Sequence, residues 1–466
     1  MDVSPCILFI CLTTCIFDLF TMADQFMGGV SGSREMSTGQ DQLDGYCNQP
    51  ELVTGHEGES FPGYSLRMVQ VLMSPGQSDI SHIMKHTSHI PPSMSCDPSV
   101  MGTMQSDQLA SLKQSVMEHA NLGRSHPDLK RFLPTFTGTC ARDHLSPHGF
   151  LQLVSIGNHF KESYLNKLEH KRMKPVYSSL HVETIESSAA YQSVLGLLHG
   201  MVAKNQFNKM KIQKITRQMC DTYDAKLPSC SCGRIRDLSP FFTQAIATGR
   251  HAFKNTSPHD LETLFKTHLN STWLDTHLNS TWLDTTSLQL FRVAMQYQCP
   301  ADKAHCQDWS LCNMFTREIL HNLYNLSADY LYSLYTDPIY QSFARLKAYP
   351  FLQQVVNRAT GPSTNQSMFV SFGDLNFLQY VRTSLSYIKR ESPKLASRLI
   401  FEIFQKNNGQ KAGGELFFRI LNDGEEISNL IQGCSKAIKL CPLRNLISMV
   451  SDFRKDFLHQ CFQFSL

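Results

Sequence analysis

Short apolar runs that predict β-strands stand near both ends of the chain, and the long middle between them has helical patterning. The first run, residues 65–73, is bounded by Pro62 and Pro75. Similar runs follow at residues 180–184, 368–372, 398–404 and 416–421. Helical patterns occupy residues 107–121, 145–168, 189–201, 238–352 and 443–457. Strands at both ends of a helical middle predict an α/β domain that carries a helical insertion.

The domain predicted from this pattern covers residues 64–466. Residues 24–63, which precede it, are polar and rich in Gly, Ser and Gln, and this composition predicts a disordered stalk. We expect the helical insertion to take its material from residues 79–140 and 225–350.

The N-terminal residues have several features of a secretion signal. Residues 6–17 form an uncharged apolar run of 12 residues, which suits a signal peptide and is short for a bilayer-spanning helix. Thr21 and Ala23 put small residues where a signal peptidase could cut. Asp2 and the lack of Lys or Arg before the run are unusual for a signal peptide. We therefore expect residues 1–23 to be a signal peptide or an uncleaved signal anchor, and an ordinary buried segment is the third interpretation.

Sequons and cysteines agree with entry into the secretory pathway. N-x-[ST] sequons begin at five positions, and we expect N-glycans at some of them: Asn255, Asn270, Asn279, Asn325 and Asn365. Of the 15 cysteines, Cys6, Cys11 and Cys15 lie in the leader, which leaves an even 12 in the mature chain. An even number suits disulfides in an oxidising compartment. Cys230 and Cys232 form a C-x-C pair, and no C-x-x-C partner exists to complete a zinc site.

Charge and repetition add little to the functional prediction. The formal net charge is +3 and there is no long basic run, so the chain lacks the charge distribution of a nucleic-acid-binding protein. The nonapeptide THLNSTWLD stands at residues 267–275 and again at 276–284. We interpret this tandem copy as a duplication tolerated in an exposed segment, and assign it no chemistry.

Several motifs occur in a characteristic order along the chain. ASRLIFEIF at residues 396–404 is followed by FFRILNDGEEI, then by Cys434 and by a CPL sequence that starts at Cys441. Upstream, LSPHGFLQ at residues 145–152 has the pattern L-[ST]-x-x-G-x-x-Q at a helix start. Cysteines at characteristic places accompany these motifs: Cys47, Cys220, Cys230 and Cys232. Across residues 46–461 the chain thereby resembles the histidine acid phosphatase family.

This resemblance implies a three-layer α/β sandwich like that of phosphoglycerate mutase, with a helical cap inserted between strands. It places the active site at the carboxyl ends of the strands, as is usual in open α/β sheets. It also implies a disulfide between Cys434 and Cys441, whose Cα atoms would then lie about 4.4–6.8 Å apart. No cofactor and no metal ion are expected.

The family's first catalytic motif is Arg-His-Gly-x-Arg directly after the first strand, where the His attacks phosphorus and both Arg bind phosphoryl oxygens. In this chain Ser74 and Ser78 stand at the two Arg positions, and Pro75 stands at the position of the nucleophile. Gly76, which permits the tight turn, matches the motif. The first motif therefore lacks its nucleophile and both of its cations.

The family's later phosphate-binding positions are replaced as well. A third Arg is expected on the helix after the second strand, where this chain has Ala189. The final His-Asp motif reads Gly373-Asp374, so the phosphate-binding His is replaced and the acid is retained. Asp374 follows a strand and precedes an apolar helical run, which favours a helix N-cap over a proton donor.

Histidines elsewhere offer an alternative site. His82 and His86 have the i, i+4 spacing of a zinc pair, and His89 follows, but no carboxylate or further ligand set is near in sequence. We interpret them as surface or loop histidines.

These residues predict a catalytically inactive, glycosylated member of the family in the secretory pathway, either secreted or in the Golgi. Its pocket would act as a binding surface for an unknown protein or glycan, with no nucleic-acid partner and a membrane contact only through an uncleaved anchor. The alternative is an active phosphomonoester hydrolase of the Golgi, acting on a xylose-2-phosphate of the glycosaminoglycan linkage region or as a general acid phosphatase. A third possibility is a structural interaction protein in which the pocket has no role.

Overall fold

The structure, a computed structural model, describes residues 39–80, 93–165, 176–215, 232–248, 287–299, 315–361, 367–407, 415–436 and 439–462. The chain divides into two units, Met1–Gln42 and Leu43–Leu466. What is described of the first unit is the start of helix α2 (Gly39–Cys47). The sheet and the other helices belong to the second unit.

One mixed sheet forms the centre of the second unit. In the described residues its order is β3-β2-β4-β1-β5-β6-β7, and β8 pairs with β6. The strands are β1 (Tyr64–Met73), β2 (Leu180–Thr184), β3 (Ile212–Lys214), β4 (Met368–Phe372), β5 (Arg398–Lys406), β6 (Leu416–Asn422), β7 (Glu425–Glu426) and β8 (Cys441–Pro442). β4 is parallel to β1 and β2, so these three carboxyl ends lie at one edge, whereas β5 runs antiparallel to β1.

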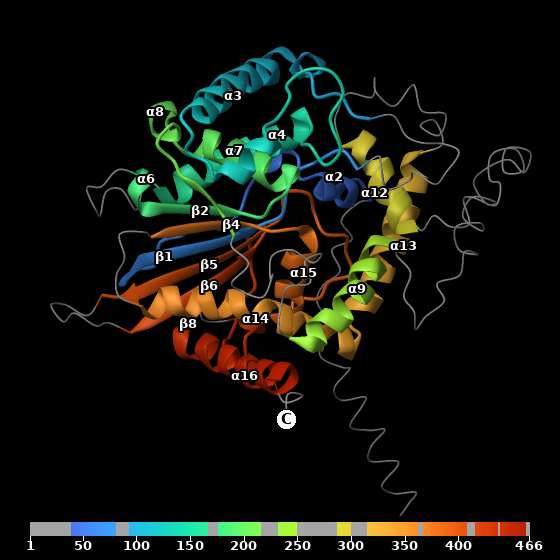
Figure 1. The fold of residues 1–466 in the computed structure, drawn as a ribbon. Coiled ribbons are helices and arrows are strands. Elements are labelled where there is room, and N and C mark those ends of the chain that lie inside the picture. The colour runs from blue at the N-terminus through green and yellow to red at the C-terminus, as the bar shows by residue number, and fades with distance from the viewer. Residues whose placement is uncertain are drawn as a thin grey trace, which may run out of the picture. The chain divides into compact units, whose positions relative to one another are not determined.

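Helices cover both faces of this sheet. Figure 1 shows α3, α4 and α7 on one face and α14, α15 and α16 on the other, with α9, α12 and α13 grouped beside the layers. The long helices are α3 (Thr103–Asn121), α4 (Pro147–Phe160), α7 (Ser188–Met201), α9 (Gly233–Thr248), α12 (Ser287–Gln298), α13 (Arg317–Tyr335), α14 (Pro338–Thr360), α15 (Leu375–Ser384) and α16 (Leu443–Phe462). The predicted three-layer α/β sandwich is therefore confirmed.

Shorter helical segments connect these elements. They are η1 (Pro50–Leu52), η3 (Pro98–Val100), η4 (Pro127–Phe132), the π-helix η5 (Lys161–Leu165), α6 (Val176–Ser179), α8 (Lys204–Phe207) and η9 (Ser428–Leu430). Among the helices that the structure describes, none is long and apolar enough to cross a membrane.

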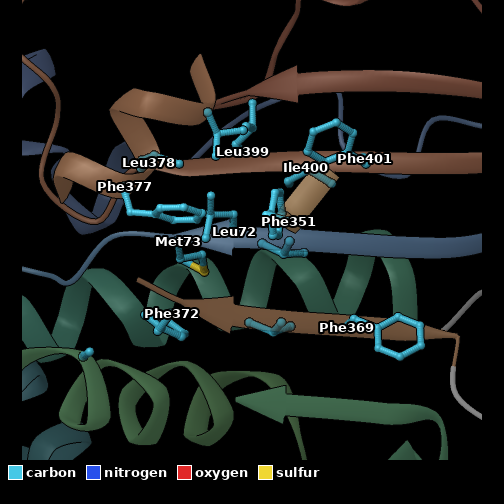
Figure 2. Packing of buried hydrophobic residues seen from close by; sticks show 14 of the residues in the cluster. Leu72, Met73, Phe351, Phe369, Phe372, Phe377, Leu378, Leu399, Ile400 and Phe401 are labelled. Atoms are coloured by element: carbon cyan, nitrogen blue, oxygen red, sulfur yellow. The ribbon is translucent and has the colours of Figure 1, made fainter. Parts of the chain in front are cut away.

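Large apolar side chains fill the space between the central strands and the helices on the α14 face. Figure 2 shows Leu72 of β1, Leu399 of β5 and Phe377 of α15 close together, and all three are fully buried. The ring of Phe351 on α14 lies edge-on to those of Phe377 and Phe401, at 6.0 Å in each case. Because burial of each such side chain contributes about 1.5–3 kcal/mol, this core fixes the carboxyl end of β1.

The expected disordered stalk over residues 24–63 is wrong for residues 43–63, which are folded into the second unit. Leu43 and Tyr46 are buried, and the Tyr46 ring packs against Phe291 at 4.9 Å. A disulfide joins Cys47 to Cys299. Few residues of this segment are apolar, so its order depends on contacts with residues far along the chain.

Buried charge holds the same segment to the sheet. Glu57 is 6% exposed, and its carboxylate accepts from Arg398 Nε at 2.7 Å and lies 3.1 Å from His159 Nε2. Burial disfavours the carboxylate, but the hydrogen bond with His159 and the charge of Arg398 outweigh burial and lower the pKa of Glu57 to about 2. A second pair, Arg419 with Glu402, is fully buried beside it.

Candidate functional site

The loop after β1 is fixed at its start by the segment that leads into β5. Ser74 is 1% exposed; its N–H donates to the carbonyl of Ser397 at 2.9 Å, and its Oγ accepts from Ser397 N at 3.0 Å. The carbonyl of Pro75 accepts from Ala396 N at 3.0 Å. The Pro75 side chain has no atom that could attack phosphorus, so the position where the resemblance expects the nucleophile is chemically inert.

The middle of the loop is clasped between α4 and α12. The Gln77 side chain is buried; its Nε2 donates to the carbonyl of Gln296 on α12 at 2.9 Å, and its Oε1 accepts from Ser146 Oγ at 2.6 Å. Gln77 N donates to Gln152 Oε1 at 2.9 Å. From α12, Gln296 Oε1 also accepts from Ile80 N at 2.9 Å. We call this set of hydrogen bonds the loop clasp.

Helix α4 begins at Ser146, a residue that also belongs to the loop clasp. Ser146 is the N-cap, its Oγ accepting from Gly149 N at 3.0 Å, and Pro147 occupies the first turn. A Cβ at Gly149 would stand 2.2 Å from the carbonyl oxygen of Gln77, so the backbones of α4 and the loop touch there. Only glycine permits this approach without a shift.

The structure brings the other positions that the resemblance marks as replaced to the same edge of the sheet. Gly373 N donates to the carbonyl of Met73 at 3.0 Å, which puts Gly373 beside the start of the loop. Ser193 Oγ on α7 accepts from Gly76 N at 3.1 Å and donates to the carbonyl of Ala189 at 2.6 Å. Ser78 lies further along the loop and forms an antiparallel bridge with Leu145. Ser74, Ala189 and Gly373 are buried, whereas Pro75, Ser78 and Asp374 stay partly exposed.

Asp374 is the N-cap of α15. Its Oδ1 accepts from Phe377 N at 2.6 Å, three residues into the helix, which is the N-cap geometry favoured by the sequence.

A buried cation close to the loop is already paired. Arg382 on α15 is 3% exposed, and its Nη2 lies 2.9 Å from Asp423 Oδ2 and 2.8 Å from Ser397 Oγ. Its Nε donates to Asn422 Oδ1 at 2.6 Å. The Asp423 side chain is 9% exposed; burial raises the pKa of its carboxyl group, but the charges of Arg382 and Arg398 outweigh burial and lower this pKa. The sequence does not predict a role for Arg382. The Asn422-Asp423 pair in FFRILNDGEEI is the sequence feature that could have indicated its partners.

In the described part of the loop, the hydroxyl of Ser74 is not hydrogen-bonded to a general base. Activation of a hydroxyl requires an adjacent general base. The Ser74 hydroxyl bonds instead to the backbone of Ser397. In the described ranges, no three His, Cys, Asp or Glu side chains are grouped as a metal site. His82, His86 and His89 lie outside the described residues.

Disulfides tie together distant parts of the fold. Cys434 and Cys441 are bonded with Cα atoms 5.4 Å apart, within the range expected from the resemblance. The other described bonds join Cys47 to Cys299, Cys96 to Cys140 and Cys232 to Cys461. Cys220 and Cys230 are outside the part of the chain that is described. These bonds suit an oxidising, secretory compartment.

One of the five sequons can be placed. Asn325 is exposed on α13, while the Oγ of Ser327 in the same sequon is buried and donates to the carbonyl of Leu323 at 2.7 Å. The remaining sequon residues, Asn255, Asn270, Asn279 and Asn365, are outside the described residues, as is the tandem repeat.

Comparison with known proteins finds relatives in both sequence and fold. The chain is 24% identical over 441 residues to 2-phosphoxylose phosphatase 1 of Danio rerio, a match that covers 88% of this chain and 83% of that protein. No protein-family profile matches the chain.

Among solved structures, the phytase of Klebsiella sp. ASR1 superposes with a TM-score of 0.53 at 12% identity, covering 84% of this chain and 97% of the phytase. A multiple inositol polyphosphate phosphatase from Bifidobacterium longum, in complex with inositol hexasulfate, gives a TM-score of 0.52 at 10% identity and covers 88% and 97% of the two chains. At this identity the two phosphatases establish a common fold. The chain is therefore similar in sequence to a 2-phosphoxylose phosphatase, and it shares the fold of these histidine acid phosphatases.

Proposed function

We propose that this protein is a catalytically inactive relative of the histidine acid phosphatases that acts by binding a partner. The observation that carries the proposal is the loop after β1, where Pro75 replaces the nucleophile and the loop clasp takes up Gln77. The carbonyl of Pro75 accepts a hydrogen bond from Ala396 N. The loop is thus built as a structural connection.

Energetics support the same proposal. Ser74, Ser78, Ala189 and Gly373 replace groups that would each bind phosphate through a charge-assisted hydrogen bond. Such bonds contribute about 1.5–3 kcal/mol each, so their combined loss removes most of the affinity for a phosphate ester. Arg382 does not replace them, because its guanidinium is buried against Asp423.

The proposal is tested by steady-state hydrolysis of an aryl phosphate and of xylose-2-phosphate, with the Danio rerio phosphatase as the active control. We expect no turnover above buffer. We expect none from Pro75→His either, because the new imidazole would face a phosphate that no Arg holds. Turnover within about a hundredfold of the control, a barrier difference of about 2.7 kcal/mol, would contradict inactivity if Asp374→Asn abolished it. Asn is itself a good N-cap, so that variant tests chemistry separately from helix stability.

The alternative is an active phosphatase acting on xylose-2-phosphate in the Golgi, or as a general acid phosphatase. Retention of Asp374 and the match to 2-phosphoxylose phosphatase 1 over 88% of the chain favour it. The same assay decides between the two proposals.

We place the protein in the secretory pathway, secreted or in the Golgi. The apolar leader and the four described disulfides support this location. In animal cells the expressed chain should lose apparent mass on treatment with an N-glycosidase. An unchanged mass together with reactive thiols would contradict the location.

A further inference from the structure

A groove of about 680 Å³ lies between η1, the start of α3 and one side of α4. Its walls come from segments far apart in the sequence, represented by Glu51, Gln105 and Leu151. The volume is in the range of small-molecule sites, which is about 300–1,000 Å³. The lining residues include none of the positions aligned with the family's catalytic motifs.

The polar side chains of the groove are amides, hydroxyls and one carboxylate. Gln105 Nε2 donates to Glu51 Oε1 at 3.3 Å, and Gln108 lies one turn further along α3. Thr103 and Ser155 add hydroxyl groups. Amides and hydroxyls both donate and accept hydrogen bonds, and the carboxylate accepts them, which suits a ligand with many hydroxyl groups.

The charge of the groove disfavours an anionic ligand. Among the described residues that line it there is no Lys or Arg, and Glu51 supplies a negative charge. The start of α3 would attract an anion, and its N-cap Gly102 supplies no side-chain hydrogen bond. Because Glu51 bonds to Gln105 in the first turn, the negative charge at this helix end is already provided by the protein.

The apolar part of the groove suits the C–H face of a ring. Leu151 is almost fully buried, whereas Met104 is 88% exposed, and Pro50 completes the apolar lining. A ligand that covers Met104 removes apolar surface from water.

A buried imidazole next to the groove has an unmet hydrogen-bonding group. His148 is 4% exposed, and its Nε2 has no hydrogen-bond partner among the described residues. It stands on the same stripe of α4 as Leu151 and Ser155, three and seven residues before them. Burial lowers the pKa of His148 to about 4, and the charge of Glu51 acts against it, which indicates that the two groups are neighbours. His148 is not itself among the lining residues, and its buried Nε2 is not a contact for a ligand in the groove.

We propose that this groove binds a neutral saccharide, with Glu51, Gln105 and Gln108 bonding its hydroxyls and Met104 covering a ring face. The inference is independent of whether the phosphatase site is active.

The test is saturation-transfer NMR on the full chain as secreted, with neutral xylo-, galacto-, manno- and gluco-tetraose and a heparin tetrasaccharide as probes. We expect at least one neutral probe to bind. Ser155→Trp, which fills the groove, and Gln108→Ala, which removes an amide, should each weaken that binding by at least about tenfold. Gln114→Ala is the matched control, since Gln114 is exposed on the same helix and bonds to Glu118 outside the groove.

Three outcomes would overturn the inference: no neutral probe binds, the heparin probe binds as well as the best neutral one, or Gln108→Ala leaves affinity unchanged. Because Gln108→Ala is a small change on a partly exposed helix face, it decides the matter even if Ser155→Trp fails to fold.

Discussion

The lack of a Cβ at Gly149 lets α4 approach the loop after β1 closely. A Cβ there would stand 2.2 Å from the carbonyl oxygen of Gln77, a backbone atom that cannot rotate away. We predict that Gly149→Ala lowers the free energy of unfolding by about 1–3 kcal/mol. Gly45→Ala on α2 is the matched control, because a Cβ at Gly45 meets nothing within 4 Å. Urea unfolding of both variants measures the difference, and equal stability would contradict the contact.

The buried imidazole of His148 predicts a dependence of stability on pH. Burial lowers the pKa of His148 to about 4. Between this pKa and the ordinary one, the unfolded chain is protonated at His148 and the folded chain is not. Its contribution is fully present above the ordinary pKa of about 6.5 and is lost as pH falls toward 4. We predict that the free energy of unfolding of His148→Leu, relative to that of the wild type, rises by about 3 kcal/mol as the pH is lowered from 7 to 4.

Urea unfolding at pH 7, 5 and 4 checks this expectation. His56→Leu, at an exposed position, should show no such gain. A constant difference between His148→Leu and the wild type over this range would show that His148 is not held neutral.

At the scale of elements, the loop clasp connects the sheet edge to α12. Gln77→Leu would leave the carbonyl of Gln296 without its donor, which costs about 1–3 kcal/mol. We predict faster amide hydrogen exchange in residues 287–298 of this variant, with α16 unchanged. Gln353→Leu is the control, since Gln353 is half-buried and its side chain bonds to Tyr349 and Asn357 of its own helix, one turn away in each direction. Equal exchange in α12 for both variants would show that the clasp does not hold that helix.

The sequence predicts those elements whose stabilising residues are close together along the chain, and misses those stabilised by residues far away in the sequence. The runs at residues 180–184 and 368–372 coincide with β2 and β4, because a buried strand needs a continuous apolar stretch that is visible locally. The segment at residues 43–63 has no such stretch. Its order comes from Cys299, and from Arg398, whose side chain meets Glu57 across 341 residues of sequence.

The candidate sites divide in the same way. Pro75 and Gly373 could be singled out because motif order marks their positions along the chain. The hydrogen bond between Gln77 and Gln296 could not be predicted, since no local pattern pairs two glutamines that are 219 residues apart. The groove beside α4 was also missed, because Glu51, Gln105 and Ser155 meet only in the folded chain.

For the whole molecule, disulfides that close long loops should contribute most to stability. Cys47–Cys299 spans 252 residues and Cys434–Cys441 spans 7. By loop entropy alone, the longer bond stabilises the fold by about 5 kcal/mol and the shorter by about 2 kcal/mol. We predict a larger drop in the guanidinium midpoint for Cys47→Ser with Cys299→Ser than for Cys434→Ser with Cys441→Ser. Equal drops would mean that native contacts, and not loop closure, determine what these bonds contribute.

The bond between Cys232 and Cys461 also has a consequence for how the protein is made. Its cysteines are 229 residues apart, and the second lies in α16 near the C-terminus. At about 5–20 residues per second, a ribosome needs roughly 10–45 s to reach Cys461 after Cys232. During translocation into an oxidising lumen, Cys232 waits for that time among other thiols with which it can pair wrongly. The yield of secreted protein should therefore rise and fall with the disulfide isomerase activity of the cell that makes it.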